Sequence, residues 1–398
     1  MKWEYKTLDQ LGEVSRGRSK HRPRNDPSLF GGKYPFIQTA DVKAANFYIT
    51  EYDTTYNEKG LAQSRLWNPG TLCITIAANI ADTGILAMDA CFPDSVMGFL
   101  PYERIADVRF VKYCFDILQQ NCKKISQGAA QDNLSWEKLS TILFPAPPIE
   151  VQTKIADILS TYDNLIENNQ KQIKLLEEAA QRLYKEWFVD LRFPGHENTK
   201  ITDGVPEGWG KYKFSDITSI MSGGTPKTDV KGFYNGNIPF YTPKDSDDSF
   251  FVLDTITHIS QSGLDNCNSQ LYPVNTVIIT ARGTVGKTTI LAVPMAMNQS
   301  CYALKCDELN SPYYLFFSLK NEVAALKKMA NGGVFNTIIV KTFDSICLIV
   351  PTQDVLNMFE ALVSPIMEQI KAKARQNIML AEARDRLLPK LMSGEIEV

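Results

Sequence analysis

The most regular hydrophobic pattern in the chain lies between residues 149 and 188. Two sets of mainly apolar residues recur there every seven positions, one set beginning at Ile155 and the other at Leu159. A heptad pattern sustained over so many turns is typical of a helix that pairs with another helix. The pattern therefore predicts a single helix, which would form a rod of roughly 60 Å at about 1.5 Å per residue.

A second long helix is expected over residues 352–392. Shifting the first seam by 204 positions brings it onto Phe359 and continues in register to the end of the segment. The second seam is weaker than the first but keeps its register, and the polar residues Asn169 and Lys373 occupy equivalent positions near the middle of the two seams. A polar seam residue costs stability but fixes the register and the partner of a helix.

The region before each helix is also repeated. Residues 32–36 match residues 236–240, and residues 66–75 match residues 271–280, in order, spacing and residue class. Both copies carry short β-type runs bounded by proline, glycine and asparagine. We therefore predict an α+β (mixed α/β) protein with two similar globular domains, separated by two long antiparallel coiled-coil helices and related by a pseudo-twofold axis. The alternative is two helices packed into one ordinary core.

These patterns predict an order of domains along the chain. A stretch rich in glycine, proline and polar residues separates the two repeats and is expected to be a linker. The predicted segments are a first globular domain at 1–148, a central long helix at 149–188, the linker at 189–205, a second globular domain at 206–351 and a C-terminal long helix at 352–392.

The composition is that of a folded soluble protein. Of the 398 residues, 44% are hydrophobic and 22% are charged, as in ordinary globular domains. No apolar run reaches the roughly eighteen residues of a membrane span, and the N-terminus lacks the apolar core of a secretory signal. The eight cysteines include no C-x-x-C pair and the three histidines lie far apart. We therefore expect a cytoplasmic protein with reduced, buried cysteines and no metal site.

The charge of the chain limits how it could bind a nucleic acid. The net charge is -3, whereas proteins that grip DNA by bulk charge are usually strongly basic. Any DNA-binding surface must therefore be local. Two similar modules held at a fixed distance nevertheless suit duplex DNA, whose major-groove faces repeat about every 34 Å. Because the modules differ in sequence, the pattern predicts a bipartite, asymmetric DNA site with an unread spacer.

The organisation of the chain resembles that of type I restriction-modification specificity subunits. Local phrases are similar as well, including the Trp3, Leu11 and Gly17 opening, residues 34–36 with their repeat at 238–240, and residues 280–287. The proline-marked start of the first helix, Pro147–Gln152, is also similar. The second helix starts with Pro351–Leu356 and lacks the glutamine found at Gln152, which is a departure from the pattern.

The resemblance implies a division of labour among several chains. Each globular domain would be a target recognition domain for double-stranded DNA. The helices would be the spacer and the docking surface for two adenine methyltransferase (modification) subunits, joined by restriction (translocase and nuclease) subunits. This chain would have no catalytic residues and bind no cofactor, because S-adenosylmethionine, ATP and Mg would bind to the partner subunits.

Basic and amide-rich loops are the candidate DNA contacts. Lysine and arginine suit phosphate oxygens, arginine can also read guanine, and glutamine and asparagine can pair with adenine. A basic loop in the first repeat contains Arg16, Arg18, Lys20, Arg22 and Arg24. A cluster recurring in both repeats contains Lys123, Lys124, Gln127, Gln131 and Asn133, and Lys327, Lys328, Asn331 and Asn336. The remaining candidates are Lys227, Arg282 and Lys287. The alternative for each is an ordinary solvated loop.

Two rival functions remain open at this point. Residues 281–288 imitate a phosphate-binding loop and would suit a nucleotide hydrolase if a helix followed them. The segment that follows is β-branched and is stopped by Pro294, which favours a tight turn instead. The second rival is a coiled-coil scaffold that joins protein partners without reading DNA.

Overall fold

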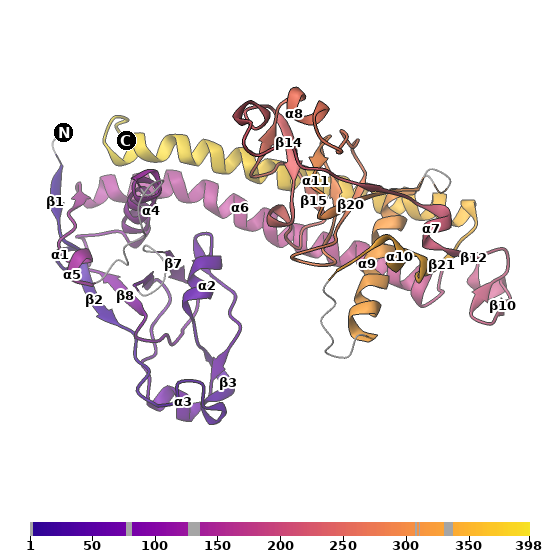
Figure 1. The fold of residues 1–398 in the computed structure, drawn as a ribbon. Helices are drawn as coiled ribbons and strands as arrows, with labels where there is room; N and C mark the ends of the chain where they lie inside the picture. Colours follow the sequence, from indigo (N-terminus) through magenta and orange to yellow (C-terminus); the bar gives the residue numbers. More distant parts are fainter. Residues whose placement is uncertain (1–2, 77–81, 126–135, 307–308, 310, 330–336) are drawn as a thin grey trace. The chain divides into compact units, whose positions relative to one another are not determined.

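The chain forms two compact units (Figure 1). The computed structural model describes residues 3–76, 82–125, 136–306, 309, 311–329 and 337–398. Unit 1 comprises Met1–Asn168 with Asn377–Val398, and unit 2 comprises Asn169–Gln376. Unit 1 is therefore assembled from two stretches that lie far apart in the sequence.

Unit 1 is built around a five-stranded sheet. Its strands lie in the order β2 (Gly12–Arg16), β8 (Val96–Pro101), β6 (Leu72–Thr75), β7 (Thr83–Leu86) and β4 (Tyr48–Ile49). Neighbouring strands are antiparallel except β4 and β7, which are parallel. Two antiparallel pairs join β1 (Glu4–Lys6) to β9 (Phe144–Ala146) and β3 (Phe30–Pro35) to β5 (Thr55–Tyr56). The unit also has four short helices, α1 (Leu8–Leu11), α2 (Thr39–Ala44), α3 (Glu58–Ala62) and α5 (Trp136–Leu139), and one 18-residue helix, α4 (Val108–Ile125).

Unit 2 contains a second five-stranded sheet. Its strands lie in the order β13 (Ser219–Ser222), β20 (Cys301–Lys305), β17 (Val277–Thr280), β18 (Thr288–Leu291) and β15 (Phe251–Val252). The smaller sheets pair β10 (Ile201–Thr202) with β11 (Val205–Pro206), β12 (Gly210–Lys213) with β21 (Cys347–Val350), and β14 (Ile238–Tyr241) with both β16 (His258–Ile259) and β19 (Ala296–Met297). The helices are α7 (Phe214–Ile217), α8 (Gln261–Asp265), α9 (Pro312–Met329) and α10 (Val340–Asp344).

The two sheets have the same topology, strand for strand. In each, the central strand is buried along its whole length, β6 in unit 1 and β17 in unit 2. In each, the outermost strand on one side, β4 or β15, is the parallel one. Helices α4 and α9 both have 18 residues and begin at Val108 and Pro312, 204 positions apart. The prediction of two similar mixed α/β modules is therefore confirmed.

The two long helices lie where the heptad patterns place them. Helix α6 covers Ile149–Tyr184 and continues as a short π-helical segment, Lys185–Val189. Helix α11 covers Gln353–Met392. Both helices begin in one unit and end in the other, so each has an opening segment (149–168 in α6, 353–376 in α11) and a closing segment (169–184 and 377–392).

Each unit combines the opening segment of one long helix with the closing segment of the other. The core of unit 1 contains Ile155 and Leu159 of α6 together with Leu388 and Leu391 of α11. The core of unit 2 reverses these roles, with Phe359 and Val363 of α11 beside Ala180 and Tyr184 of α6. Residues near the start of one helix thus meet residues near the end of the other, so the two segments in each unit run antiparallel.

The side chain of Gln152 links the start of α6 to neighbouring backbone groups of unit 1 by hydrogen bonds. The side chain is 1% exposed, and its amide donates to the carbonyl oxygens of Pro147 and Ile105, both at 2.9 Å. Its side-chain oxygen accepts from the backbone N–H of Asp107 at 3.1 Å. The equivalent residue in α11 is Leu356, which is also 1% exposed. One repeat therefore uses hydrogen bonds where the other uses apolar packing.

Replacing Gln152 with leucine, as in the second repeat, is expected to destabilise unit 1 by about 2–4 kcal/mol. The variant would leave the three backbone groups that Gln152 now bonds without their partners, and unsatisfied buried groups are costly. The reciprocal Leu356→Gln should also be destabilising. Urea unfolding followed by a probe in each unit would measure both, and wild-type stability in Gln152→Leu would contradict this account.

The cysteine expectation holds for most of the described thiols. None of the described cysteines forms a disulfide, and five of them, Cys73, Cys91, Cys114, Cys301 and Cys306, are buried. Burial raises the pKa of Cys301 to about 12. Cys347 is exposed, so the expectation is wrong for that residue. Among the helices described, none is both long and apolar enough to cross a membrane.

Candidate functional site

Each unit has a cleft at the same place in its fold. In unit 1 the cleft lies where the β6–β7 hairpin approaches helix α4. In unit 2 it lies where the β17–β18 hairpin approaches helix α9. Equivalent residues line both: Thr83 and Thr288 begin the second hairpin strand, and Asp116 and Lys320 lie on the helix. The cleft of unit 1 has a volume of about 460 Å³ and that of unit 2 about 200 Å³.

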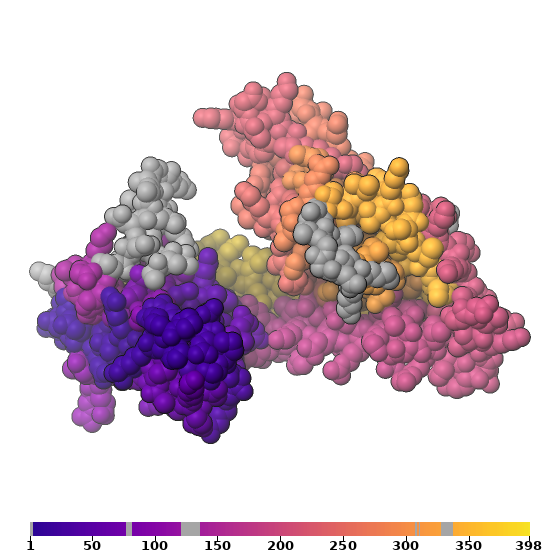
Figure 2. All heavy atoms as spheres, turned by 60° about the horizontal axis from the view of Figure 1, so that its bottom comes forward, coloured from indigo at the N-terminus to yellow at the C-terminus, as the bar shows by residue number. Residues whose placement is uncertain are grey.

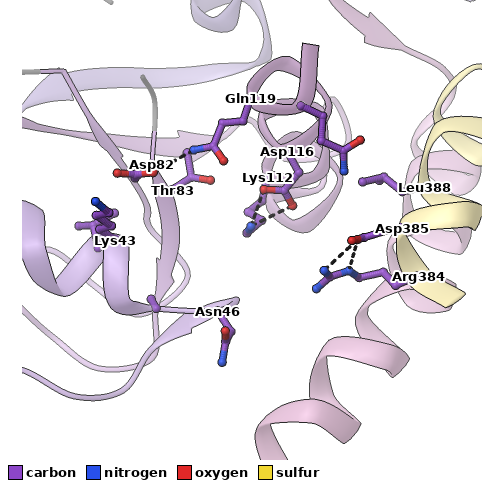
Figure 3. Close-up of a pocket in the computed structure, with 13 residues that line it drawn as sticks. Lys43, Asn46, Asp82, Thr83, Lys112, Asp116, Gln119, Arg384, Asp385 and Leu388 are labelled. Carbon is purple, nitrogen blue, oxygen red and sulfur yellow. Dashed lines mark hydrogen bonds and ion pairs between the residues drawn. The ribbon is translucent and has the colours of Figure 1, made fainter. Parts of the chain in front are cut away.

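The unit 1 cleft is lined by balanced charges (Figure 3). Lys112 is 5% exposed and its ammonium group bonds both carboxylate oxygens of Asp116, at 2.7 and 2.9 Å. One turn further along the same helix, the side chain of Gln119 donates to Asp82 at 3.1 Å. The closing segment of α11 supplies Arg384, which bonds Asp385 on the cleft wall. These contacts leave the cleft polar without an excess of either sign.

A buried charge pair lies beside this cleft. Asp163 of α6 is 2% exposed and accepts a 2.5 Å hydrogen bond from the hydroxyl of Tyr113 on α4. The guanidinium of Arg384 on α11 donates to the other oxygen of the same carboxylate. Burial, and the nearby Asp163 charge, raise the pKa of Tyr113, which therefore stays a protonated donor. The three side chains come from three different helices, α4, α6 and α11, and their contacts hold these helices together.

The unit 2 cleft carries an excess of positive charge. Three lysines, Lys287, Lys320 and Lys327, face Asp247 and Asp248. Lys287 is ion-paired with Asp248, and this hydrogen bond lowers the pKa of the Asp248 carboxyl. Burial lowers the pKa of Lys320, whose ammonium group lies over the ring of Phe250, 4.4 Å from the ring centre. The lining of this cleft therefore has one more basic than acidic side chain, whereas the basic and acidic side chains of the unit 1 cleft are equal in number.

Residues 281–288 form the turn of a β-hairpin. Gly283 and Gly286 have positive φ angles of 79° and 76°, and Thr280 receives a hydrogen bond from the backbone N–H of Lys287 at 3.0 Å. The chain then enters strand β18 rather than a helix. A phosphate-binding loop needs a helix N-terminus at this point, so the structure does not favour the nucleotide-hydrolase alternative. Arg282 is exposed on the turn, while Lys287 points to Asp248.

The basic loop begins with Arg16 at the end of β2 and lies on the surface of unit 1. Figure 2 shows indigo N-terminal residues over much of this unit. Two of the loop's five basic residues are tied into the fold: Arg22 donates to the carbonyl oxygens of Ser19 and His21, and Arg24 pairs with Asp94 at 2.8 Å. Exposed positions in the same loop are held by Arg16, Arg18 and Lys20.

The recurrent lysine and amide cluster lies largely outside the described residues. The side chains of Lys123, Lys124 and Lys328 are not described, and neither are Gln127, Gln131, Asn133, Asn331 and Asn336. The ammonium group of Lys327 lies 3.4 Å from the carbonyl oxygen of Gly286, at the turn of the β17–β18 hairpin. Lys227 is exposed on the loop after β13. The structure thus brings Lys287 and Lys327 to one cleft, and the other candidates stay predictions.

Sequence reasoning missed the charge pair of unit 1. The heptad pattern places Arg384 at a position of the second, weaker seam, but nothing in that pattern indicates Asp163 or Tyr113 as its partners. A signal was present in the repeat: all three positions differ in polarity between the two copies, as described below.

The sequence profile of the type I restriction modification DNA specificity domain matches the chain twice, over residues 1–178 and 206–374. These two matches together cover most of the chain. The chain belongs to this family. The sequence-based identification is therefore confirmed.

Named members of the family align with nearly the full length. The MjaIX specificity subunit of Methanocaldococcus jannaschii is 27% identical, with 100% of this chain and 94% of that protein aligned. The HindI specificity subunit of Haemophilus influenzae is 25% identical over 97% of this chain and 98% of that protein. The crystal structure of the type I restriction-modification S subunit of M. genitalium has the same fold, with a TM-score of 0.58 at 15% identity, covering 98% of this chain and 96% of that one.

Proposed function

We propose that this chain is the DNA-reading specificity subunit of a type I restriction-modification complex, and that each unit reads one half of a bipartite, asymmetric DNA site. One observation carries the proposal. The two family matches fall on two modules with the same sheet topology but with different charges lining their equivalent clefts. Modules with one fold and different surfaces suit two half-sites of different sequence.

Catalysis and cofactors are assigned to other chains under this proposal. Adenine methylation would use S-adenosylmethionine on the methyltransferase subunits, and DNA cleavage would use ATP and Mg on the restriction subunits. This chain would act in the cytoplasm as a non-catalytic subunit that selects the DNA sequence.

The outer faces of the two long helices support docking of two equivalent partners. Ile158 and Leu362 are equivalent in the two helices and are 38% and 53% exposed. Leu175 and Met379 are also equivalent and are 65% and 64% exposed. Each unit therefore presents one apolar residue of each pair, as two copies of the same methyltransferase subunit would require.

The test is a map of methylated adenines in cells with and without this gene. The expected result is loss of methylation at every occurrence of one two-part sequence with an unread spacer of fixed length. An unchanged methylation map in an otherwise active system would contradict the proposal.

Removing the three exposed charges of the basic loop is expected to weaken DNA binding by roughly tenfold or more and to reduce the salt dependence, because each phosphate contact contributes about 0.9 to the logarithmic slope. The variant is Arg16→Ala, Arg18→Ala and Lys20→Ala, measured in the complex with its methyltransferase subunits. The matched control is Lys200→Ala, Lys211→Ala and Lys213→Ala, which removes the same net charge from exposed positions of unit 2. If both variants showed the same salt dependence of DNA binding, the basic loop would not be part of the DNA interface.

A further inference from the structure

The buried polar group of unit 1 has an apolar counterpart in unit 2. Shifting each position by 204 residues, Tyr113 becomes Phe317, Asp163 becomes Met367, and Arg384 becomes Ala180. The three apolar residues are 3%, 0% and 0% exposed, in that order, and belong to the core of unit 2. All three positions differ together, from polar to apolar.

The two members of the charge pair come from different repeats. Asp163, in the opening segment of α6, belongs to the first repeat. Tyr113 on α4 belongs to the same repeat. Arg384 lies in the closing segment of α11, in the second repeat. The polar group is therefore complete only when the second repeat supplies the closing segment of unit 1.

Pairing between two first repeats would break this group. The closing segment would then come from α6 of a second copy and would place Ala180 where Arg384 lies now. Asp163, which is 2% exposed, would keep the hydroxyl of Tyr113 but lose its ion pair with Arg384. A buried charge without its partner is strongly unfavourable.

Pairing between two second repeats would fail for the opposite reason. Arg384 would then take the place of Ala180, which is fully buried and belongs to the same apolar core as Met367 and Phe317. The guanidinium would meet Met367, rather than a carboxylate, at the position equivalent to Asp163. When a first repeat pairs with a second repeat, unit 1 has its complete ion pair and unit 2 is apolar at all three positions. Neither kind of self-pairing gives this result.

We propose that Tyr113, Asp163 and Arg384 form a pairing code, which directs the closing segment of α11 into unit 1 and excludes the closing segment of α6 from a second copy of the chain. The code acts on how the two repeats assemble, whatever ligand the assembled protein binds, so it stands independently of the proposed function.

The test uses the full chain with a protease site inserted between Asp203 and Gly204. These residues form the exposed turn between β10 and β11, where insertions are tolerated best. The folded protein is cleaved, equilibrated in dilute urea so that the two pieces exchange, and returned to buffer. Native mass spectrometry then counts mixed pairs and both kinds of self-pair. For the wild-type protein, mixed pairs are expected to exceed self-pairs by roughly a hundredfold or more.

Two variants remove the code in opposite ways. Y113F/D163M/R384A makes both units apolar, and A180R/F317Y/M367D makes both units polar. In either variant all pairings become equivalent at these three positions, so the excess of mixed pairs is expected to fall by about tenfold or more. A purely structural role would change stability in each variant without changing which pieces pair.

The control replaces an exposed ion pair on the same helix, Glu382→Ala with Arg386→Ala, whose side chains are 60% and 82% exposed. It should leave the wild-type ratio unchanged. The more stable of the two triple variants decides the test. If it keeps the wild-type excess of mixed pairs, other contacts determine the pairing and the proposal is overturned.

Discussion

Arg384→Ala is expected to destabilise unit 1 by about 3–5 kcal/mol, because removing one partner of a buried ion pair leaves the other charge uncompensated. Asp163, which is 2% exposed, would keep the hydrogen bond from the Tyr113 hydroxyl but lose its ion pair. Hydrogen exchange measures the effect locally. Backbone amides of α4 and of strand β6 should exchange faster, while those of β17, the equivalent strand of unit 2, should keep their wild-type rates.

Two further variants show whether the loss comes from the unpaired charge. Adding Asp163→Met and Tyr113→Phe should recover most of the lost stability, because well-packed apolar residues often replace a buried ion pair at little or no cost. Arg386→Ala, which removes an 82% exposed arginine two residues away, should change stability by no more than about 0.5 kcal/mol. Failure of the added substitutions to rescue Arg384→Ala would show that packing, rather than charge, explains the loss.

Ile158→Asp and Leu362→Asp are each expected to release one of the two methyltransferase subunits. A carboxylate at an apolar contact must be desolvated without a partner, which should weaken that contact by roughly a hundredfold or more. The two residues are equivalent and lie in different units. Native mass spectrometry of the co-expressed complex should therefore count two methyltransferase subunits per chain in the wild type, one in each single variant and none in the double variant.

Gln181→Asp is the matched control for docking, since Gln181 is an exposed residue of α6 that falls on the other flank of the heptad seam. It should retain both partners. Retention of two subunits in the double variant would show that the partners dock on other surfaces, without bearing on DNA recognition by the modules.

The long helices could be predicted from sequence because their pattern is local and regular. Residues such as Ile155 and Phe359 repeat every seven positions, and none of the heptad positions along either helix is exposed. The duplicated sheet was also predictable, since Leu66–Thr75 and its repeat keep their spacing. The exchange of closing segments was not predictable, because a heptad pattern shows that a helix has a partner without showing which module that partner completes.

The candidate contacts were harder to predict than the fold. The sequence shows that Lys287 is basic, but not that Asp248, 39 positions earlier, binds its ammonium group. It likewise shows Arg384 interrupting a seam without showing Asp163, 221 positions away, as the reason. Pairs that are distant in sequence depend on the three-dimensional fold, and a single sequence does not contain that information in any local pattern.

The order in which the ribosome makes the chain bears on how unit 1 folds. Its sheet and α4 are synthesised first, but Leu388, Leu391 and Met392 of its core are made last, after the whole of unit 2. Domains usually fold as they leave the ribosome, N-terminal first. Here the core of unit 1 lacks these residues until translation reaches 377–392, so unit 1 can be completed only after all of unit 2 has been made.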